Sequence, residues 1–145
     1  MNQSASSMLT ILVLISSCVS PPDYTDGLLE NIPAIVNETD YFSLSILGDD
    51  YTDEKDWDIE LTTVDTDIIL STLVIKDLNI NPTGSSYLYL MRESGDTIFT
   101  APLLSELVWT SQDSIGLIGS PKKVAFSGNK FSGRLEYQII KNPLQ

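Results

Sequence analysis

The sequence predicts an all-β protein, folded as an antiparallel β-sandwich of about seven to nine strands. Apolar and polar residues alternate with a period of two in several segments, as they do in half-buried strands. Short runs rich in Gly, Asn, Asp and Ser separate these segments, whereas helical spacing of apolar residues is rare. Hydrophobic residues make up 42% of the 145, which is enough for the core of one domain.

The first half of the predicted domain contains a possible helical turn and then strands. Residues 28–36 have apolar spacing compatible with a turn or two of helix, and a proline among them prevents a longer one. Trp57, Ile59 and Leu61 alternate with polar residues, which predicts a strand with one buried face. Residues 68–75 are apolar on both faces, which predicts a central strand covered on both sides.

The second half of the domain is also predicted to be mainly strands. Residues 86–91 alternate tyrosine with leucine, so one of these two sets faces away from the core. Turn-forming residues at 93–96 and at 127–130 predict hairpins. Residues 103–108 predict a short helix or a strand, and residues 131–139 predict a final strand with one apolar face.

One short segment resembles a known family. Residues 78–82 (LNINP), followed by Tyr87 at the start of an alternating strand, resemble the E–F corner of fibronectin type III and related immunoglobulin-like domains. Trp57 corresponds in this resemblance to the core tryptophan of such sandwiches. The resemblance covers about ten residues. It implies that the sandwich is immunoglobulin-like.

Composition excludes several classes of function. The chain has 8 basic and 20 acidic side chains, no His and a single Cys, for a net charge of −12. A disulfide framework needs paired cysteines, and a His/Cys zinc site needs several ligands. The chain has no His that could activate a nucleophile, and it has few Lys and Arg side chains to neutralise the phosphates of a nucleic acid. We therefore expect no enzyme and no nucleic-acid partner.

The N-terminal residues differ from the rest of the chain. Residues 1–7 are polar, and residues 8–15 form the apolar run MLTILVLI, which precedes Ser16, Ser17 and Cys18. A run of this length is much shorter than the ~20 residues that span a bilayer as a helix. It matches the hydrophobic region of a cleaved signal peptide, although a positively charged start is missing.

The residues from Ile15 to Cys18 resemble the lipobox of bacterial lipoproteins, in which an aliphatic residue and two small residues precede a cysteine. The resemblance implies cleavage before Cys18 and acylation of this residue, so that acyl chains attach the protein to a membrane of the bacterial cell envelope. Two alternatives are a buried free cysteine in a core strand, and ordinary secretion with cleavage after Ser20. The predicted organisation is a signal peptide over 1–17, a lipidated flexible tether over 18–27 and a β-sandwich domain over 28–145.

Acidic residues are concentrated in the N-terminal half of the domain and are densest in residues 48–58, which are predicted to form a loop. Three interpretations are open: a solvated hairpin loop, a Ca²⁺ site built from hard oxygen ligands, and a docking surface for a basic partner. The spacing does not match an EF-hand loop. The residues proposed for a metal or partner are Asp49, Asp50, Asp53, Asp56 and Asp58.

Trp57 and Trp109 are the residues proposed for stacking against a carbohydrate. Aromatic faces beside carboxylates are the surface that such a role needs. Trp57 is in phase with Ile59 and Leu61, however, which favours a position in the core.

These observations predict a lipid-anchored domain of the cell envelope with a non-catalytic role in protein interaction or structure. Its expected partners are the membrane, through the acyl chains on Cys18, and another envelope protein. The alternatives are a carbohydrate-binding accessory domain and a Ca²⁺-binding sandwich, and no cofactor other than Ca²⁺ is expected.

Overall fold

The computed structural model describes residues 27–144, so the predicted signal peptide, Cys18 and nearly all of the tether lie outside the described residues. The described residues form an antiparallel all-β fold, which confirms the predicted class. None of their helices is long and apolar enough to cross a membrane. The elements are β1 (Ala34–Asn37), β2 (Tyr41–Asp58), β3 (Ile68–Asn79), β4 (Tyr87–Arg92), β5 (Thr97–Pro102), β6 (Leu107–Ser114), α1 (Ile115–Ile118) and β7 (Pro121–Lys141).

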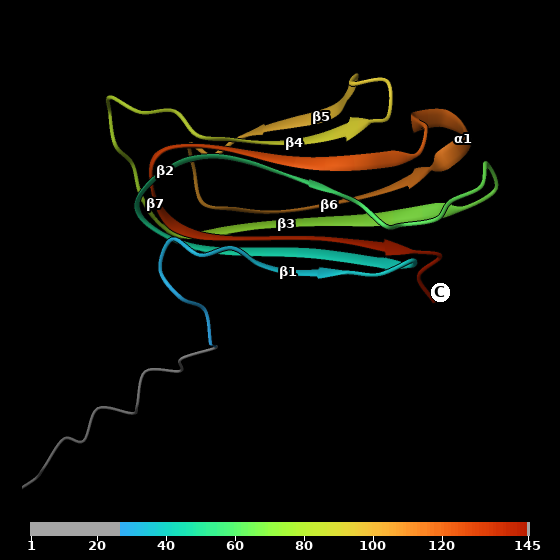
Figure 1. Cartoon of the computed structure of the whole chain (residues 1–145), viewed down its shortest axis with the longest axis horizontal. Helices are drawn as coiled ribbons and strands as arrows, with labels where there is room; N and C mark the ends of the chain where they lie inside the picture. The colour runs from blue at the N-terminus through green and yellow to red at the C-terminus, as the bar shows by residue number, and fades with distance from the viewer. Residues whose placement is uncertain (1–26, 145) are drawn as a thin grey trace, which may run out of the picture.

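Two layers of strands face one another, and the two longest strands belong to both layers (Figure 1). The larger layer has the order β1, first half of β2, second half of β7, β3 and β6. The smaller layer has the order β5, β4, first half of β7 and second half of β2. The β2–β7 pair therefore crosses from one layer to the other and joins them along one side.

The bend in the β2–β7 pair depends on glycine and on unusual backbone angles. Gly48 pairs with Gly133, and the register shifts immediately afterwards. A Cβ atom on Gly48 would lie 2.6 Å from the carbonyl oxygen of Phe131, which leaves no space for a side chain. Asp50 and Lys130 adopt φ values of 48° and 54° at the same corner. Such bulges bend strands and increase their twist.

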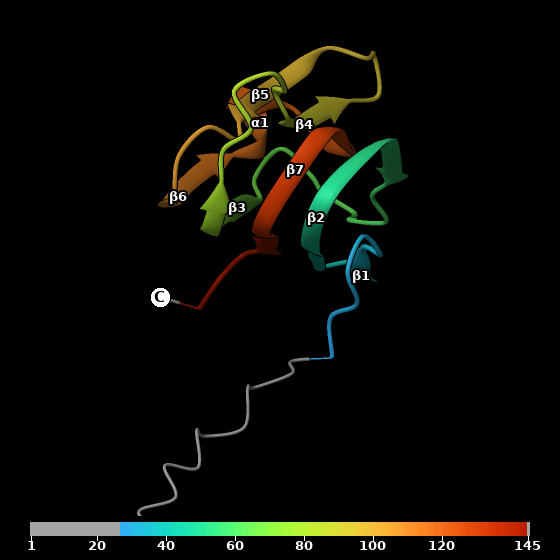
Figure 2. The ribbon, with the colours of Figure 1, turned by 90° about the vertical axis from the view of Figure 1, so that its left-hand side faces the viewer.

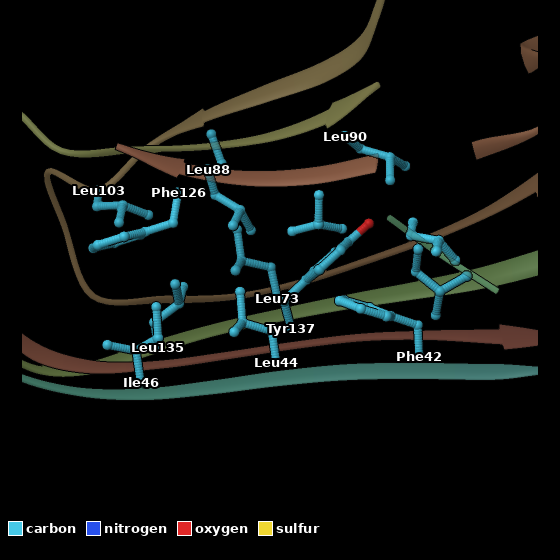
Figure 3. Close-up of a cluster of buried hydrophobic side chains, with 14 of the residues drawn as sticks. Phe42, Leu44, Ile46, Leu73, Leu88, Leu90, Leu103, Phe126, Leu135 and Tyr137 are labelled. Carbon is cyan, nitrogen blue, oxygen red and sulfur yellow. The ribbon is translucent and has the colours of Figure 1, made fainter. Parts of the chain in front are cut away.

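The core fills the space between the two layers (Figure 3). Every second residue of β2, from Phe42 to Ile46, is buried, and the final strand buries Leu135, Tyr137 and Ile139 as the alternation predicted. The larger layer contributes further apolar side chains from β3, and the smaller layer contributes them from β4 and β7. These are Ile69, Leu73, Ile75, Leu88, Leu90, Val124 and Phe126.

Two predicted turns have different outcomes. The hairpin at 93–96 is confirmed, because the Arg92 amide donates to the Asp96 carbonyl at 2.8 Å and Gly95 has a φ of 87°. The hairpin predicted at 127–130 is wrong, because these residues lie inside the continuous strand β7. The same turn-forming residues serve there as the bend that passes β7 between the layers.

Other predictions about individual elements also need correction. Residues 34–37 form strand β1 instead of a helical turn, because pairing with β2 offers their backbone a ladder of hydrogen bonds. Residues 48–58 were predicted as a loop and belong to β2. In β3, alternate side chains are buried and half-buried, so the strand is covered on one side only. Of residues 103–108, predicted as a short helix or a strand, residues 107 and 108 are in a strand, where β6 begins.

Candidate functional site

The sandwich is open along the side where β5 and β6 lie. Strand β2 pairs with one side of β7 along its whole length. Strands β4 and β3 pair with the other side of β7, β4 with its first half and β3 with its second half. Strand β5 continues the smaller layer beyond β4, and β6 continues the larger layer beyond β3. Figure 2 shows β5 and β6 on one side of the domain and β1 on the opposite side. Among the described residues, β5 pairs only with β4 and β6 only with β3.

An aromatic pair bridges the two strands at this open edge. Trp109 of β6 is in register with the buried Leu73, so its side chain faces the space between the layers. Phe99 of β5 reaches the same space, and the two ring centroids lie 5.3 Å apart. Phe99 also contacts the ring of Tyr137 edge-on, with centroids 5.6 Å apart. Trp109 nevertheless keeps 38% of its surface exposed.

A largely apolar groove lies on one side of the aromatic pair. Its volume is about 390 Å³, and its walls come from β3, β5, β6 and the loop between β5 and β6. Leu104 in that loop lines the groove and is 49% exposed. Leu73, Ala101, Pro102 and Leu107 also line the groove.

A smaller and more polar pocket lies on the other side of the same aromatic pair. Its volume is about 200 Å³, and Phe99 and Trp109 belong to both cavities. Ser71, Ser111 and Asp113 bring oxygen atoms to this pocket. The Ser111 hydroxyl donates to Asp113 Oδ2 at 2.6 Å. Leu90, Ile98 and Ile118 complete the lining.

A buried phenol lies in the core close to this polar pocket. Tyr137 is fully buried between the layers, and its hydroxyl makes no hydrogen bond of good geometry to the residues that the structure describes (Figure 3). Burial is the main cause of a strongly raised pKa for this hydroxyl, to which the charge of Asp113 adds. Ser71 lies near enough to lower the pKa in part. The hydroxyl is therefore neutral at ordinary pH.

The acidic residues of β2 face the basic residues of β7. Lys123 Nζ lies 3.5 Å from Asp56 Oδ2 and 3.9 Å from Asp58 Oδ1. Asp53 forms an ion pair with Lys55 at 3.0 Å, and the hydrogen bond from Lys55 is the first cause of a lowered pKa for Asp53. These pairs are exposed to solvent, so each contributes little to stability.

The two acidic residues at the corner make backbone contacts. The Asp49 amide and carbonyl both bond to the side chain of Asn31, at 2.8 and 2.9 Å. The Asp50 amide donates to the Ser132 hydroxyl at 2.9 Å. Within residues 27–144 no group of three or more carboxylates gathers around a common point. A Ca²⁺ site here stays a prediction.

The structure does not bring the two tryptophans together. Trp57 lies on the second half of β2, at the edge of the smaller layer away from β5, where it is half-buried against the core. Trp109 lies at the opposite, open edge. The leucines of β4 face the core, and Tyr87 and Tyr89 stack on the outer surface with centroids 6.0 Å apart.

Another cavity lies elsewhere, at the end of the smaller layer. It has a volume of about 420 Å³ and contains charges of both signs. Lys123, which lines it, already pairs with Asp56 and Asp58, and Arg92 donates to the Ile118 carbonyl at 2.6 Å. Its lining mixes the basic Arg92, Lys122 and Lys123 with the acidic Asp58 and Glu93.

Sequence reasoning identified Trp109 but missed the residues around it. The signal for Ser111 and Asp113 was their spacing of two and four residues from Trp109, which puts all three on one face of a strand. No sequence signal links them to Phe99 or Ser71, because those contacts depend on the pairing of β6 with β3 and on the closure of the two layers.

Comparisons with known proteins identify no family. No family model matches the chain, and no curated protein matches it. One solved structure is similar to it, described as "Bacillus endospore appendages form a novel family of disulfide-linked pili". The TM-score is 0.41 and the sequence identity 13%, with 79% of this chain and 92% of that chain covered. A likeness at this level does not assign a function.

Proposed function

We propose that the chain is a non-catalytic docking domain of the bacterial cell envelope, attached to a membrane by acyl chains on Cys18. It binds another protein at the open β5–β6 edge. The observation that carries this proposal is the exposed Trp109 on that edge, packed against Phe99 beside an apolar groove of about 390 Å³. Exposed apolar surface of this kind is typical of sites that bind proteins or other ligands.

Strand β6 offers a partner two means of recognition. Its outer backbone groups have no partner strand within the described residues, so an extended segment can pair with them. The adjoining groove can receive apolar side chains from the same segment. The net charge of −12 favours a basic partner, because opposite charge accelerates encounter and excludes acidic competitors.

The position of the first described residues agrees with this use of the edge. The first described residues lie against the end of the first half of β2, where the Asn31 amide donates to the Leu47 carbonyl at 2.8 Å. Strand β1 follows, at the edge of the larger layer opposite β6. A domain attached through its N-terminus therefore presents the β5–β6 edge on the side away from its attachment.

Affinity capture with matched variants tests the docking role. The full-length lipidated chain is recovered from detergent-solubilised membranes as wild type, as Leu104→Glu and as Leu117→Glu. Leu104 lines the groove, whereas Leu117 is 86% exposed on α1 and lies outside it. We expect a companion protein to accompany the wild type and the Leu117 variant but not the Leu104 variant. A companion that accompanies all three, or none, contradicts docking at this edge.

The anchor has its own test. Mass spectrometry of the mature protein should show an acylated N-terminal Cys18, and Cys18→Ser should remove the protein from the membrane fraction. Several acyl chains are needed for stable attachment, since each buried CH₂ contributes ~0.8 kcal/mol. An unmodified sulfur with the leader still attached contradicts the proposed location.

A carbohydrate ligand is the second candidate, and the exposure of Trp109 beside an aromatic ring and a carboxylate favours it. Affinity electrophoresis through gels that contain envelope polysaccharides tests this candidate. Retardation of the wild type that is lost in Trp109→Ala and kept in Trp57→Phe supports sugar binding. Equal mobility with and without polysaccharide rejects it.

A further inference from the structure

We infer that the polar pocket behind Trp109 binds a primary ammonium group, supplied by a lysine side chain of the partner or by a free alkylamine. The lysine source rests on the proposed docking function, whereas the ammonium chemistry rests on the pocket alone. The pocket combines one carboxylate, two hydroxyls and two aromatic rings in a volume of about 200 Å³.

The oxygen atoms of the pocket fit an ammonium group. Asp113, Ser111 and Ser71 all line it, and an ammonium group has three N–H donors and no acceptor. Ser111 already donates its proton to Asp113 at 2.6 Å, so its oxygen lone pairs remain available to accept. No lysine or arginine lines the pocket. The negative charge of Asp113 is thus available to an incoming cation.

The aromatic walls favour the same ligand. A cation over the face of Trp or Phe is attracted by the ring quadrupole, most strongly where water is partly excluded. Trp109 and Phe99 line both the polar pocket and the apolar groove. An alkyl stem can therefore lie against these rings while the ammonium group reaches Asp113. Lysine side chains commonly divide their apolar and charged parts in this way.

A fully buried hydroxyl lies next to one of the residues that line the pocket. The Tyr137 hydroxyl makes no hydrogen bond of good geometry within the described residues, and Ser71 is near enough to interact with it. A buried hydroxyl that is hydrogen-bonded so poorly costs stability. Ser71 connects the hydroxyl to the pocket, because it lines the pocket and also lies near enough to the Tyr137 hydroxyl to lower its pKa. An ammonium group that donates to the Ser71 oxygen leaves the Ser71 hydroxyl proton available for the Tyr137 oxygen.

The chemistry of the pocket separates an ammonium from a metal ion. A Ca²⁺ ion takes six to eight oxygen ligands, usually with several carboxylates. The pocket has Asp113 as its single carboxylate, and within residues 27–144 no group of three acidic side chains is placed to hold a metal ion. One negative charge with two hydroxyls matches a single positive charge.

Titration of the full-length chain with n-butylammonium tests the inference by NMR of the tryptophan indole N–H groups. We expect a saturable shift of the Trp109 signal, assigned with Trp109→Phe, and no shift of the Trp57 signal at the opposite edge. n-Butanol, which has the same alkyl body without charge, should produce no such shift. Asp113→Asn should weaken the binding of the amine by at least about tenfold, because the charge that accepts from the ammonium group is lost.

Two outcomes overturn the inference: a Trp109 signal that does not move, or a shift that butanol reproduces and Asp113→Asn leaves unchanged.

A second titration distinguishes a partner's lysine from a free amine. Its probe is an extended peptide that carries one lysine between Thr and Val residues. Tighter binding of this peptide than of n-butylammonium, lost when norleucine replaces the lysine, indicates the partner's lysine. Equal binding of both probes indicates a free amine.

Failure of the inference and failure of the proposed function give different results. If the amine does not bind while Leu104→Glu still loses the companion, the ammonium pocket is wrong and docking stands. If the amine binds while all variants keep the same companion, docking at this edge is wrong and the pocket stands.

Discussion

Tyr137 shows how one side chain can serve both the core and a neighbouring site. Its ring fills the space between the layers and contacts Phe99, while its hydroxyl makes no hydrogen bond of good geometry within the described residues. A phenylalanine would supply the same apolar volume without the orphan oxygen. The tyrosine therefore costs stability, and a cost of this kind is commonly found where function requires it.

Replacing this residue should stabilise the free protein. We expect Tyr137→Phe to raise the free energy of unfolding by about 1 kcal/mol, because an unsatisfied buried hydroxyl is removed. Urea unfolding of the two proteins measures the difference. Tyr89→Phe, on the outer surface, is the matched control and should change stability by less than about 0.5 kcal/mol. A loss of stability in Tyr137→Phe would show that the hydroxyl is satisfied in solution.

Asp67 contributes to the stability of the fold, and this contribution depends on pH. Its carboxylate accepts from the Asn142 amide at 2.9 Å and from the Val64 backbone amide at 2.8 Å, and so ties the end of β7 to the turn before β3. These hydrogen bonds, the one from Asn142 first, lower the pKa of Asp67. A lowered carboxyl pKa stabilises the fold above the pKa of the unfolded state, and this stabilisation disappears as the pH falls through the folded value.

The lowered pKa of Asp67 predicts how its replacement changes the stability of the fold with pH. Asp67→Asn should be less stable than the wild type at pH 7, and the difference should narrow as the pH falls below about 4, where the unfolded carboxyl also takes up its proton. Thermal unfolding of both proteins over a range of pH measures this difference in stability. A difference that stays constant down to the acid limit of the fold contradicts a role for the Asp67 charge.

At the scale of elements, the fold depends on the bend that β2 and β7 share. Gly48 and Gly133 face one another there, and both strands then shift register. Without this bend a pair of such long strands would extend one flat sheet, and the apolar face of each half would stay exposed. The bend lets both halves bury that face against each other.

Gly48→Ala tests this dependence. A Cβ atom would meet the Phe131 carbonyl at 2.6 Å and the Phe131 ring at 2.5 Å, and the backbone contact cannot move freely. We expect a loss of about 1–3 kcal/mol in the free energy of unfolding, as for other overpacked sites. Ser43→Ala, on the outer face of the same strand, should stay within about 0.5 kcal/mol of the wild type. Equal small losses in both variants contradict a tight corner.

The sequence predicted the elements whose pattern is local and missed those that depend on distant pairing. Alternation in residues 131–139 identified the buried face of β7, and turn chemistry at 93–96 identified a hairpin. Residues 127–130 carry the same turn chemistry but form a bend, because the partner β2 continues beside them. The residues around Trp109 were missed for a related reason, since Phe99 and Ser71 meet it only through the closure of two layers.

At the scale of the whole molecule, the uneven distribution of charge along the chain becomes more balanced in space. Of the 20 acidic residues, 14 lie between residues 23 and 67, and five of the 8 basic residues lie between 122 and 141. Antiparallel pairing of β2 with β7 brings these regions together, and Lys123 contacts two of the acidic side chains. The acidic segment is thus partly a structural partner of β7, which the sequence alone did not reveal.

The central claim is that the β5–β6 edge meets a partner protein while the chain is held on a membrane. Site-specific photo-crosslinking in the source cells tests it most directly. A photoreactive residue replaces Leu104 in one full-length variant and the exposed Leu117 in another. We predict one discrete adduct in the membrane fraction from position 104 and none of the same mass from position 117. No adduct at 104, or the same adduct from both positions, contradicts the claim.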